Sequence, residues 1–334
     1  MFELSARPPT SEEAKVAPAE SAEYPFNGEF TSRRPDEVAS FYEHFAALDE
    51  LIAWMRDRPA STPVVHEVPG ETEVAVVIPT ARFEGELARR CRETTFRGLQ
   101  LVFLESPRFP DPYFNLPAYV NLGIRCAMAH RPAWIILSGD DVLRVDEPRA
   151  LVDGLAQIDP HSVDTVFTTP SGRYHSLRSN LAPGNAWRRL AFGLSRAKRA
   201  VLRAERKFGA TLHAARAEGW EARFFGSGYP HLSYASFGIL SAGYVEARHG
   251  RVLDETFGNS GSEDVELSLR LSRDPRRVAF VKYRIDELRG ATLGVDDARR
   301  LREVAGLAYL NQLVRARPSD YFAVGFDSRR LLAP

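Results

Sequence analysis

The sequence predicts an α/β protein with a doubly wound, mostly parallel sheet and flanking helices. Short apolar runs at 74–78, 99–104 and 134–137 are typical of strands that are buried on both faces. Segments with apolar residues at helical spacing separate these runs. Strand, helix and strand therefore alternate, as they do in parallel α/β sheets.

The composition excludes several other classes. The chain has 334 residues, enough for a large core, and its 44 Lys and Arg balance its 44 Asp and Glu. We therefore expect no nucleic-acid partner. Two cysteines make neither a disulfide framework nor a zinc cluster, which suits a reducing compartment. Without a signal peptide or an apolar run of about 20 residues, we expect a cytoplasmic protein, at most peripheral on a membrane.

Before the first predicted strand the chain divides into two segments. Residues 1–34 are rich in Pro, Glu, Ser and Ala and predict a poorly ordered arm. Residues 35–72 predict an accessory helix, with apolar residues three and four apart, followed by a linker that contains several Pro and Thr.

The remaining chain divides into two halves, at 73–170 and 171–295, and a C-terminal helix and tail at 296–334. Further strands are predicted at 165–169, at 278–283 and within the apolar stretch 234–240. Helices are predicted at 84–94, 117–130, 148–158, 242–248, from 263 onward and at 299–314.

Polar side chains follow the first three strands: Thr80, Glu105 and the pair Asp140-Asp141. In an open parallel sheet the ligand lies beyond the carboxyl ends of the strands, so these groups are expected to converge there. Two adjacent carboxylates resist ionising together unless a cation lies between them, which favours a Mg²⁺ or Mn²⁺ site that holds a diphosphate. The alternative is a solvated turn that caps the next helix.

Residues 186–207 have an apolar stripe at helical spacing and eight basic residues, opposed only by Glu205. This pattern fits a basic helix that lies on an anionic membrane or grips a phosphorylated acceptor. Taken alone, the pattern is more typical of an ordinary surface helix with a solvated basic face.

Four motifs resemble those of GT-A fold nucleotide-sugar glycosyltransferases, most closely family 2, whose fold is Rossmann-like. They occur in the family's order between about residues 74 and 295. The motifs are Val76-Val77-Ile78-Pro79-Thr80, Asn121-Leu122-Gly123-Ile124-Arg125-Cys126-Ala127, Ser138-Gly139-Asp140-Asp141-Val142 and Glu263-Asp264-Val265-Glu266-Leu267-Ser268-Leu269-Arg270.

The resemblance implies that residues 73–170 bind a nucleoside diphosphate sugar, with UDP or GDP as the nucleotide. Residues 171–295 would then bind the acceptor, which is a glycan, a lipid-linked molecule or a small molecule. It implies an inverting transfer in which Asp264 is the general base, Glu263 orients the acceptor or the base, and Asp141 holds Mn²⁺ or Mg²⁺. The donor-binding residues that it implies are Pro79, Thr80, Glu105, Asn121, Arg125 and Asp140. The acceptor-side residues that we consider are His231, Tyr234 and Arg270.

The chain departs from the family at three places. Glu105 stands where the family has Asp, so the choice of base stays open. Gly139 replaces the first acid of the Asp-x-Asp pattern. No histidine occurs in 284–290, where many relatives have a metal ligand. Either a carboxylate substitutes, or the metal has one protein ligand together with phosphates and water, as Mg²⁺ often does.

Other functions stay open. A non-catalytic binding module of the same fold is one, and a retaining transferase is another. A sugar-1-phosphate nucleotidyltransferase is a third, although the turn after the first strand, 79–85, is poor in the glycine that those enzymes use. The Gly- and Ser-rich segment 257–262 has the small residues that a closing lid needs. The sequence does not indicate the oligomeric state.

Overall fold

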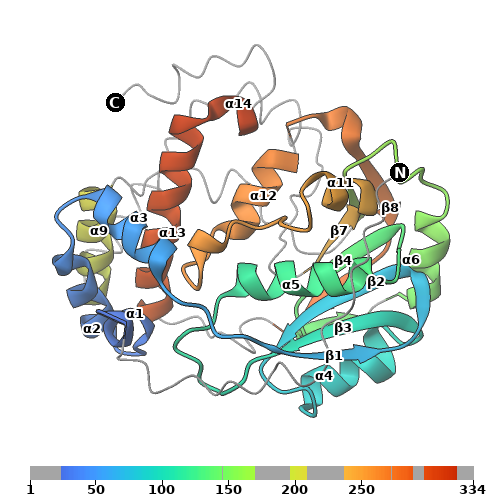
Figure 1. Cartoon of the computed structure of the whole chain (residues 1–334), viewed down its shortest axis with the longest axis horizontal. Coiled ribbons are helices and arrows are strands. Elements are labelled where there is room, and N and C mark those ends of the chain that lie inside the picture. Colours follow the sequence, from blue (N-terminus) through green and yellow to red (C-terminus); the bar gives the residue numbers. More distant parts are fainter. Residues whose placement is uncertain are drawn as a thin grey trace, which may run out of the picture.

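The computed structural model describes residues 24–144, 146–169, 196–208, 237–271, 273–288 and 297–321. Over these residues the protein is an α/β fold in which helices flank a mixed, mostly parallel sheet of seven strands (Figure 1). This architecture confirms the predicted α/β class with a mostly parallel sheet and flanking helices, and it is compatible with a Rossmann-like fold.

The strand order across the sheet is β1-β3-β2-β4-β7-β6-β8. Strands β2, β3, β4, β6 and β8 run in one direction, whereas β1 and β7 run antiparallel to their neighbours. A separate two-stranded sheet pairs β5 with β9. The strands are β1 (Val64–Val68), β2 (Glu71–Thr80), β3 (Leu99–Glu105), β4 (Trp134–Ser138), β5 (Val142–Arg144), β6 (Thr165–Thr169), β7 (Phe237–Ser241), β8 (Val278–Lys282) and β9 (Ile285–Glu287).

The helices lie close to the predicted positions. In chain order, the described α-helices are α1 (Asn27–Thr31), α2 (Pro35–Phe41), α3 (Leu48–Asp57), α4 (Glu86–Arg90), α5 (Leu116–Met128), α6 (Pro148–Leu155), α9 (Arg196–Phe208), α11 (Ala242–Ala247), α12 (Glu263–Leu271), α13 (Asp297–Ala316) and α14 (Pro318–Tyr321). A π-helical turn, Cys91–Thr95, continues α4.

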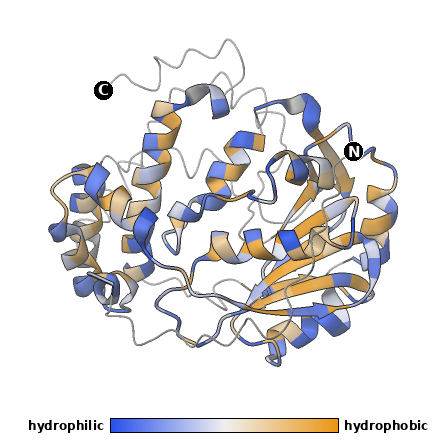
Figure 2. Ribbon diagram, viewed as in Figure 1, coloured by the Kyte–Doolittle hydropathy of each residue, from blue (hydrophilic) through white to orange (hydrophobic). Residues whose placement is uncertain are grey.

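The sheet is apolar on both faces because each face is covered. Alternate residues of β2 point to opposite sides: Val76 belongs to the core under α4 and α6, and Val77 to the core under α5 and α11. Figure 2 shows the hydrophobic strands between these helices. This double burial explains why the strands read as continuous apolar runs.

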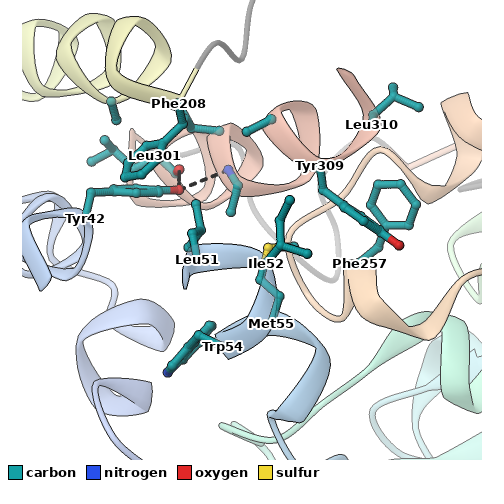
Figure 3. Close-up of a cluster of buried hydrophobic side chains, with 14 of the residues drawn as sticks. Tyr42, Leu51, Ile52, Trp54, Met55, Phe208, Phe257, Leu301, Tyr309 and Leu310 are labelled. Carbon is teal, nitrogen blue, oxygen red and sulfur yellow. Dashed lines mark hydrogen bonds between the residues drawn. The ribbon is translucent and has the colours of Figure 1, made fainter. Parts of the chain in front are cut away.

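A third core lies within a cluster of helices beside the sheet: α1, α2, α3, α9 and α13 (Figure 3). The Tyr42 hydroxyl accepts a hydrogen bond from Ala305 N, 3.1 Å away, and donates one to Leu301 O. Trp54 and Phe41 pack edge to face with their ring centroids 4.6 Å apart. Helix α12 joins this cluster to the sheet, because its apolar residues divide between the two cores.

The structure corrects three predictions about the N-terminal region. Phe30 of α1 is buried, so the end of the predicted arm belongs to the helical cluster. The predicted accessory helix is broken into α2, the 3₁₀ turn Tyr42–His44 and α3. The predicted linker contains β1, which pairs with β3 at the edge of the sheet. Residues 1–23 lie outside the described residues.

The basic segment forms α9, which starts later than predicted, and residues 186–195 lie outside the described residues. Two apolar residues of α9, Ala204 and Phe208, are buried in the helical cluster, and Lys207 Nζ donates to Tyr42 O over 3.0 Å. This side of α9 is therefore not available for insertion into a membrane. Over the described residues, no helix is long and apolar enough to cross a bilayer.

Candidate active site

The sheet has a topological switch point between β2 and β4. After β2 the chain passes to β3 on one side, and it then crosses back to β4 on the other side. Ligands of open α/β sheets bind in the crevice beyond the strand ends at such a point. Thr80 ends β2, and the Ser138-Gly139-Asp140-Asp141 turn ends β4. The predicted convergence is present, because Thr80 Oγ1 donates a 2.7 Å hydrogen bond to Asp140 Oδ2.

The acidic turn is supported from two sides. The π-helical turn lies behind it: Cys91 Sγ donates to Asp140 O over 3.4 Å, and Thr95 Oγ1 donates to Val142 O over 3.3 Å. On the other side, Leu288 N donates to Asp141 O over 2.9 Å, which continues the pairing of β5 with β9. The backbone of 285–288 therefore lies beside Asp141.

The donor set fits a hard divalent cation of the kind that binds through few protein ligands. Within the described ranges, no three His, Cys, Asp or Glu side chains are grouped as a protein-only metal cage. Asp140 is 4% exposed and accepts from Thr80, whereas Asp141 is partly exposed. Mg²⁺ commonly takes one or two carboxylates and completes its shell with phosphate oxygens and water. Asp141 can supply such a carboxylate.

Glu105 lies at this edge, but its carboxylate already has two partners. Its Oε1 accepts from Phe83 N over 3.1 Å, and its Oε2 lies 2.7 Å from His66 Nε2 of β1. His66 stacks on the Phe83 ring at 4.1 Å, and Arg92 lies over the same ring, also at 4.1 Å. Glu105 thus fixes the turn that follows β2. Pro79 lies beside Leu104 in the register of β2 and β3, one residue before the strand ends.

The Asn-x-Gly motif of α5 joins this helix to the sheet and to the segment around Val252. Asn121 is fully buried, and its Oδ1 accepts from Val252 N and Leu253 N at 3.0 Å. Its Nδ2 donates to Leu253 O and Glu255 Oε1. A Cβ on Gly123 would lie 2.4 Å from Val77 Cγ1, so glycine is needed for α5 to approach the sheet.

Arg125 does not lie with the acidic turn. Helix α5 begins after the carboxyl end of β3 and ends before the start of β4, so Arg125, near its C-terminus, lies toward the opposite edge of the sheet. Its side chain is exposed and passes against Gly250. The structure therefore does not bring the predicted donor residue Arg125 to the strand ends.

Arg270, predicted on the acceptor side, is buried, and its hydrogen bonds join neighbouring segments of the chain. Its guanidinium makes a bidentate contact with Glu266, with bonds of 3.0 and 2.7 Å. It also donates to Tyr244 Oη and to Val252 O. These partners tie α12 to α11 and to the segment that Asn121 holds, so the described contacts of Arg270 are structural.

Glu263 and Asp264 occupy the first turn of α12, as predicted. Glu263 is only 6% exposed, and its Oε2 has no hydrogen-bond partner among the described residues. Burial, reinforced by the charge of Asp264, raises the pKa of Glu263 to about 8. Helix α13 faces the pair with Arg299, which opposes this shift, and with Glu303, which adds to it. Arg299 Nε lies 3.1 Å from Glu303 Oε1.

The segment 257–262 is not a free lid. Phe257 and Ser260 are each 1% exposed, and the Phe257 ring packs on Tyr309 at a centroid distance of 4.9 Å. A Cβ on Gly306 of α13 would lie 2.2 Å from Gly261 O, so the segment and α13 are in close backbone contact. The small residues of this loop serve packing, which corrects the predicted lid.

His231 and Tyr234 lie outside the described residues. The sequence analysis missed two groups, one that faces Glu263 and one beside the acidic turn. Arg299 and Glu303 face Glu263 from α13, and Arg90 lies at the end of α4 beside the acidic turn. No motif marks either group, because their positions depend on the packing of distant segments.

Comparison with protein-family models, curated proteins and solved structures gives no match.

Proposed function

We propose that the protein is a metal-dependent glycosyltransferase of the GT-A kind, which moves a sugar from a nucleoside diphosphate sugar to an acceptor hydroxyl. The observation that carries this proposal is the arrangement at the switch point of the sheet. Thr80 holds Asp140 at 2.7 Å, and Asp141 follows in a turn fixed by the π-helical turn and by the segment after β9. A nucleotide diphosphate fits the crevice outside such strand ends.

In this proposal Asp141 holds Mn²⁺ or Mg²⁺ together with the donor phosphates. When bound, the cation supplies Lewis-acid stabilisation of the charge on the leaving diphosphate. Asp140 is held by Thr80 and serves the ribose or a position behind the cation. Glu105 fixes the turn at Phe83, and with it one wall of the base pocket.

On the acceptor side Asp264 takes the proton of the attacking hydroxyl. The new bond forms between that oxygen and the sugar C1, and the bond from C1 to the diphosphate breaks, with its electron pair leaving on the nucleotide. A single displacement of this kind inverts C1. Glu263, whose raised pKa keeps it largely protonated at pH 7, can donate a hydrogen bond that orients the acceptor or Asp264.

The acceptor class stays open among glycans, lipid-linked molecules and small molecules. Because α9 buries Ala204 and Phe208 in the protein, we expect any contact of α9 with a membrane to be electrostatic and sensitive to salt.

The test is a thermal-shift panel of UDP, GDP and their sugars, with and without Mn²⁺. One diphosphate is expected to raise the Tm by a few degrees in a metal-dependent way, since ligand at 100 times its Kd stabilises by about 2.7 kcal/mol. Asp141→Asn should lose this shift. Asp153→Asn, at an exposed aspartate of α6, is the matched control. A panel without any nucleotide shift contradicts the proposal, and hydrolysis of the nucleotide sugar without acceptor separates an enzyme from a binding module.

A further inference from the structure

Arg90, the last residue of α4, has an unusual environment. Its Nε and Nη2 are shut off from solvent, and neither has a hydrogen-bond partner among the described residues. No ion pair joins Arg90 to a carboxylate within these same residues. The adjacent Arg89 is exposed. The side chain as a whole is partly exposed, but burying these two nitrogens without partners is costly, because they lose water and gain nothing in return.

The position of Arg90 places this guanidinium beside the acidic turn. Its chain neighbour Cys91 donates from Sγ to Asp140 O over 3.4 Å. Burial raises the pKa of the Cys91 thiol to about 12; Asp140 and Asp141 add to the shift, and Arg90 and Arg92 oppose it. The charges of all four groups therefore act on one sulfur atom. Arg90 belongs to the same edge of the sheet as the proposed donor site.

An anion at this edge would satisfy what the protein leaves unsatisfied. Guanidinium groups bind phosphate oxygens through parallel N–H bonds, and a buried site strengthens such bonds. A diphosphate can contact a cation on Asp141 with one group of oxygens and Arg90 with another. Asp140 and Asp141 would then face positive charge from both sources.

We propose that Arg90 is an anion subsite that binds a diphosphate group beside the Asp140-Asp141 turn. This inference rests on the proposed function for its ligand class, since a nucleoside diphosphate sugar carries such a group. The rival role for Arg90 is structural: its charge offsets the field of the two aspartates without binding a ligand. The two roles predict opposite effects on the stability of the free protein.

The experiment compares Arg90→Met with Arg89→Met, using inorganic pyrophosphate as the probe, with and without Mg²⁺. Methionine keeps an aliphatic stem and removes the donors. For an anion subsite, Arg90→Met should raise the Tm of the ligand-free protein by about 1–3 °C, because an unsatisfied buried group has been removed. Pyrophosphate should raise the Tm of the unchanged protein and of Arg89→Met. Its affinity for Arg90→Met should fall about ten- to a hundredfold.

Two results overturn the subsite. A lower Tm for ligand-free Arg90→Met assigns the guanidinium a structural role. If the unchanged protein does not bind pyrophosphate, or if Arg90→Met binds it equally strongly, then Arg90 does not bind an anion. The proposed function can fail separately: pyrophosphate binding that depends on Arg90, without a shift by any nucleotide, keeps the subsite and rejects the glycosyltransferase.

Discussion

Asp140 at the strand edge and Glu263 at the start of α12 are buried to almost the same degree, with 4% and 6% of their surface exposed. Their surroundings differ. Asp140 accepts a hydrogen bond from Thr80 and lies beside the Cys91 thiol and Arg90. Glu263 has an oxygen without a partner, faces other carboxylates, and has a pKa raised to about 8.

This difference shows that burial alone does not decide whether a carboxylate is protonated or ionised. A buried acid with donors can stay ionised, whereas one among other acids retains its proton. The strand edge thus offers a buried carboxylate a hydrogen-bond donor and nearby arginines. The start of α12 is built to hold a proton, which suits a place where protons are exchanged.

The largest expected effect on stability comes from removing the partner of a buried carboxylate that is now hydrogen-bonded, which leaves it in an environment like that of Glu263. Arg270→Met leaves Glu266 buried without its bidentate partner. We expect the free energy of unfolding to fall by about 3–5 kcal/mol, measured by urea denaturation. Arg273→Met, at an exposed arginine, should change it by less than about 0.5 kcal/mol.

A double variant sharpens this test. Glu266→Leu combined with Arg270→Met replaces both charges by apolar groups, so most of the lost stability should return. A single Arg270→Met variant as stable as the unchanged protein would show that the ion pair contributes nothing to α12.

The second prediction concerns the pH dependence of stability at Glu263. The pKa of Glu263 in the folded protein, about 8, lies above its ordinary value of 4.5. Its stabilising contribution to the free energy of unfolding is therefore fully present below pH 4.5 and is lost as the pH rises to about 8. The loss is on the order of 5 kcal/mol. Glu263→Gln mimics the protonated form, so it should match the unchanged protein near pH 4.5 and be more stable at pH 9.

The measurement is urea denaturation of both proteins at pH 4.5, 7 and 9. Glu246→Gln, at an exposed glutamate of α11, is the control and should show no such gain at high pH. If Glu263→Gln and the unchanged protein are equally stable at pH 9, the pKa of Glu263 is not raised, and the contrast with Asp140 does not hold.

The sequence predicted those elements whose burial produces a recognisable pattern of apolar residues. Strands covered on both faces appear as apolar runs, and β6 lies at the predicted 165–169. The strands that were missed carry no such pattern. β1 is an edge strand in which Val64 and Val65 are exposed, and β5 and β9 have three residues each.

The candidate site was predictable only at the strand ends. Parallel strands bring their carboxyl ends together whatever the loops do, so Thr80 and Asp140 meet as expected. Motifs on helices identify a residue but not what its side chain faces. Asn121 and Arg270 face neighbouring segments, and the burial of Nε and Nη2 of Arg90 arises from tertiary packing that no local pattern records.

The smallest expected effect is at Thr80. Thr80→Val keeps the shape of the side chain but removes the hydroxyl that donates to Asp140 Oδ2, so this buried carboxylate loses one hydrogen bond. We expect a loss of about 1–3 kcal/mol in the free energy of unfolding, together with a weaker metal-dependent shift by the nucleotide diphosphate. Thr80→Ser keeps the hydroxyl and should preserve both properties. If valine and serine behave alike, the hydroxyl of Thr80 does not support Asp140, and the acidic turn is held by its backbone contacts with Cys91 and Leu288 instead.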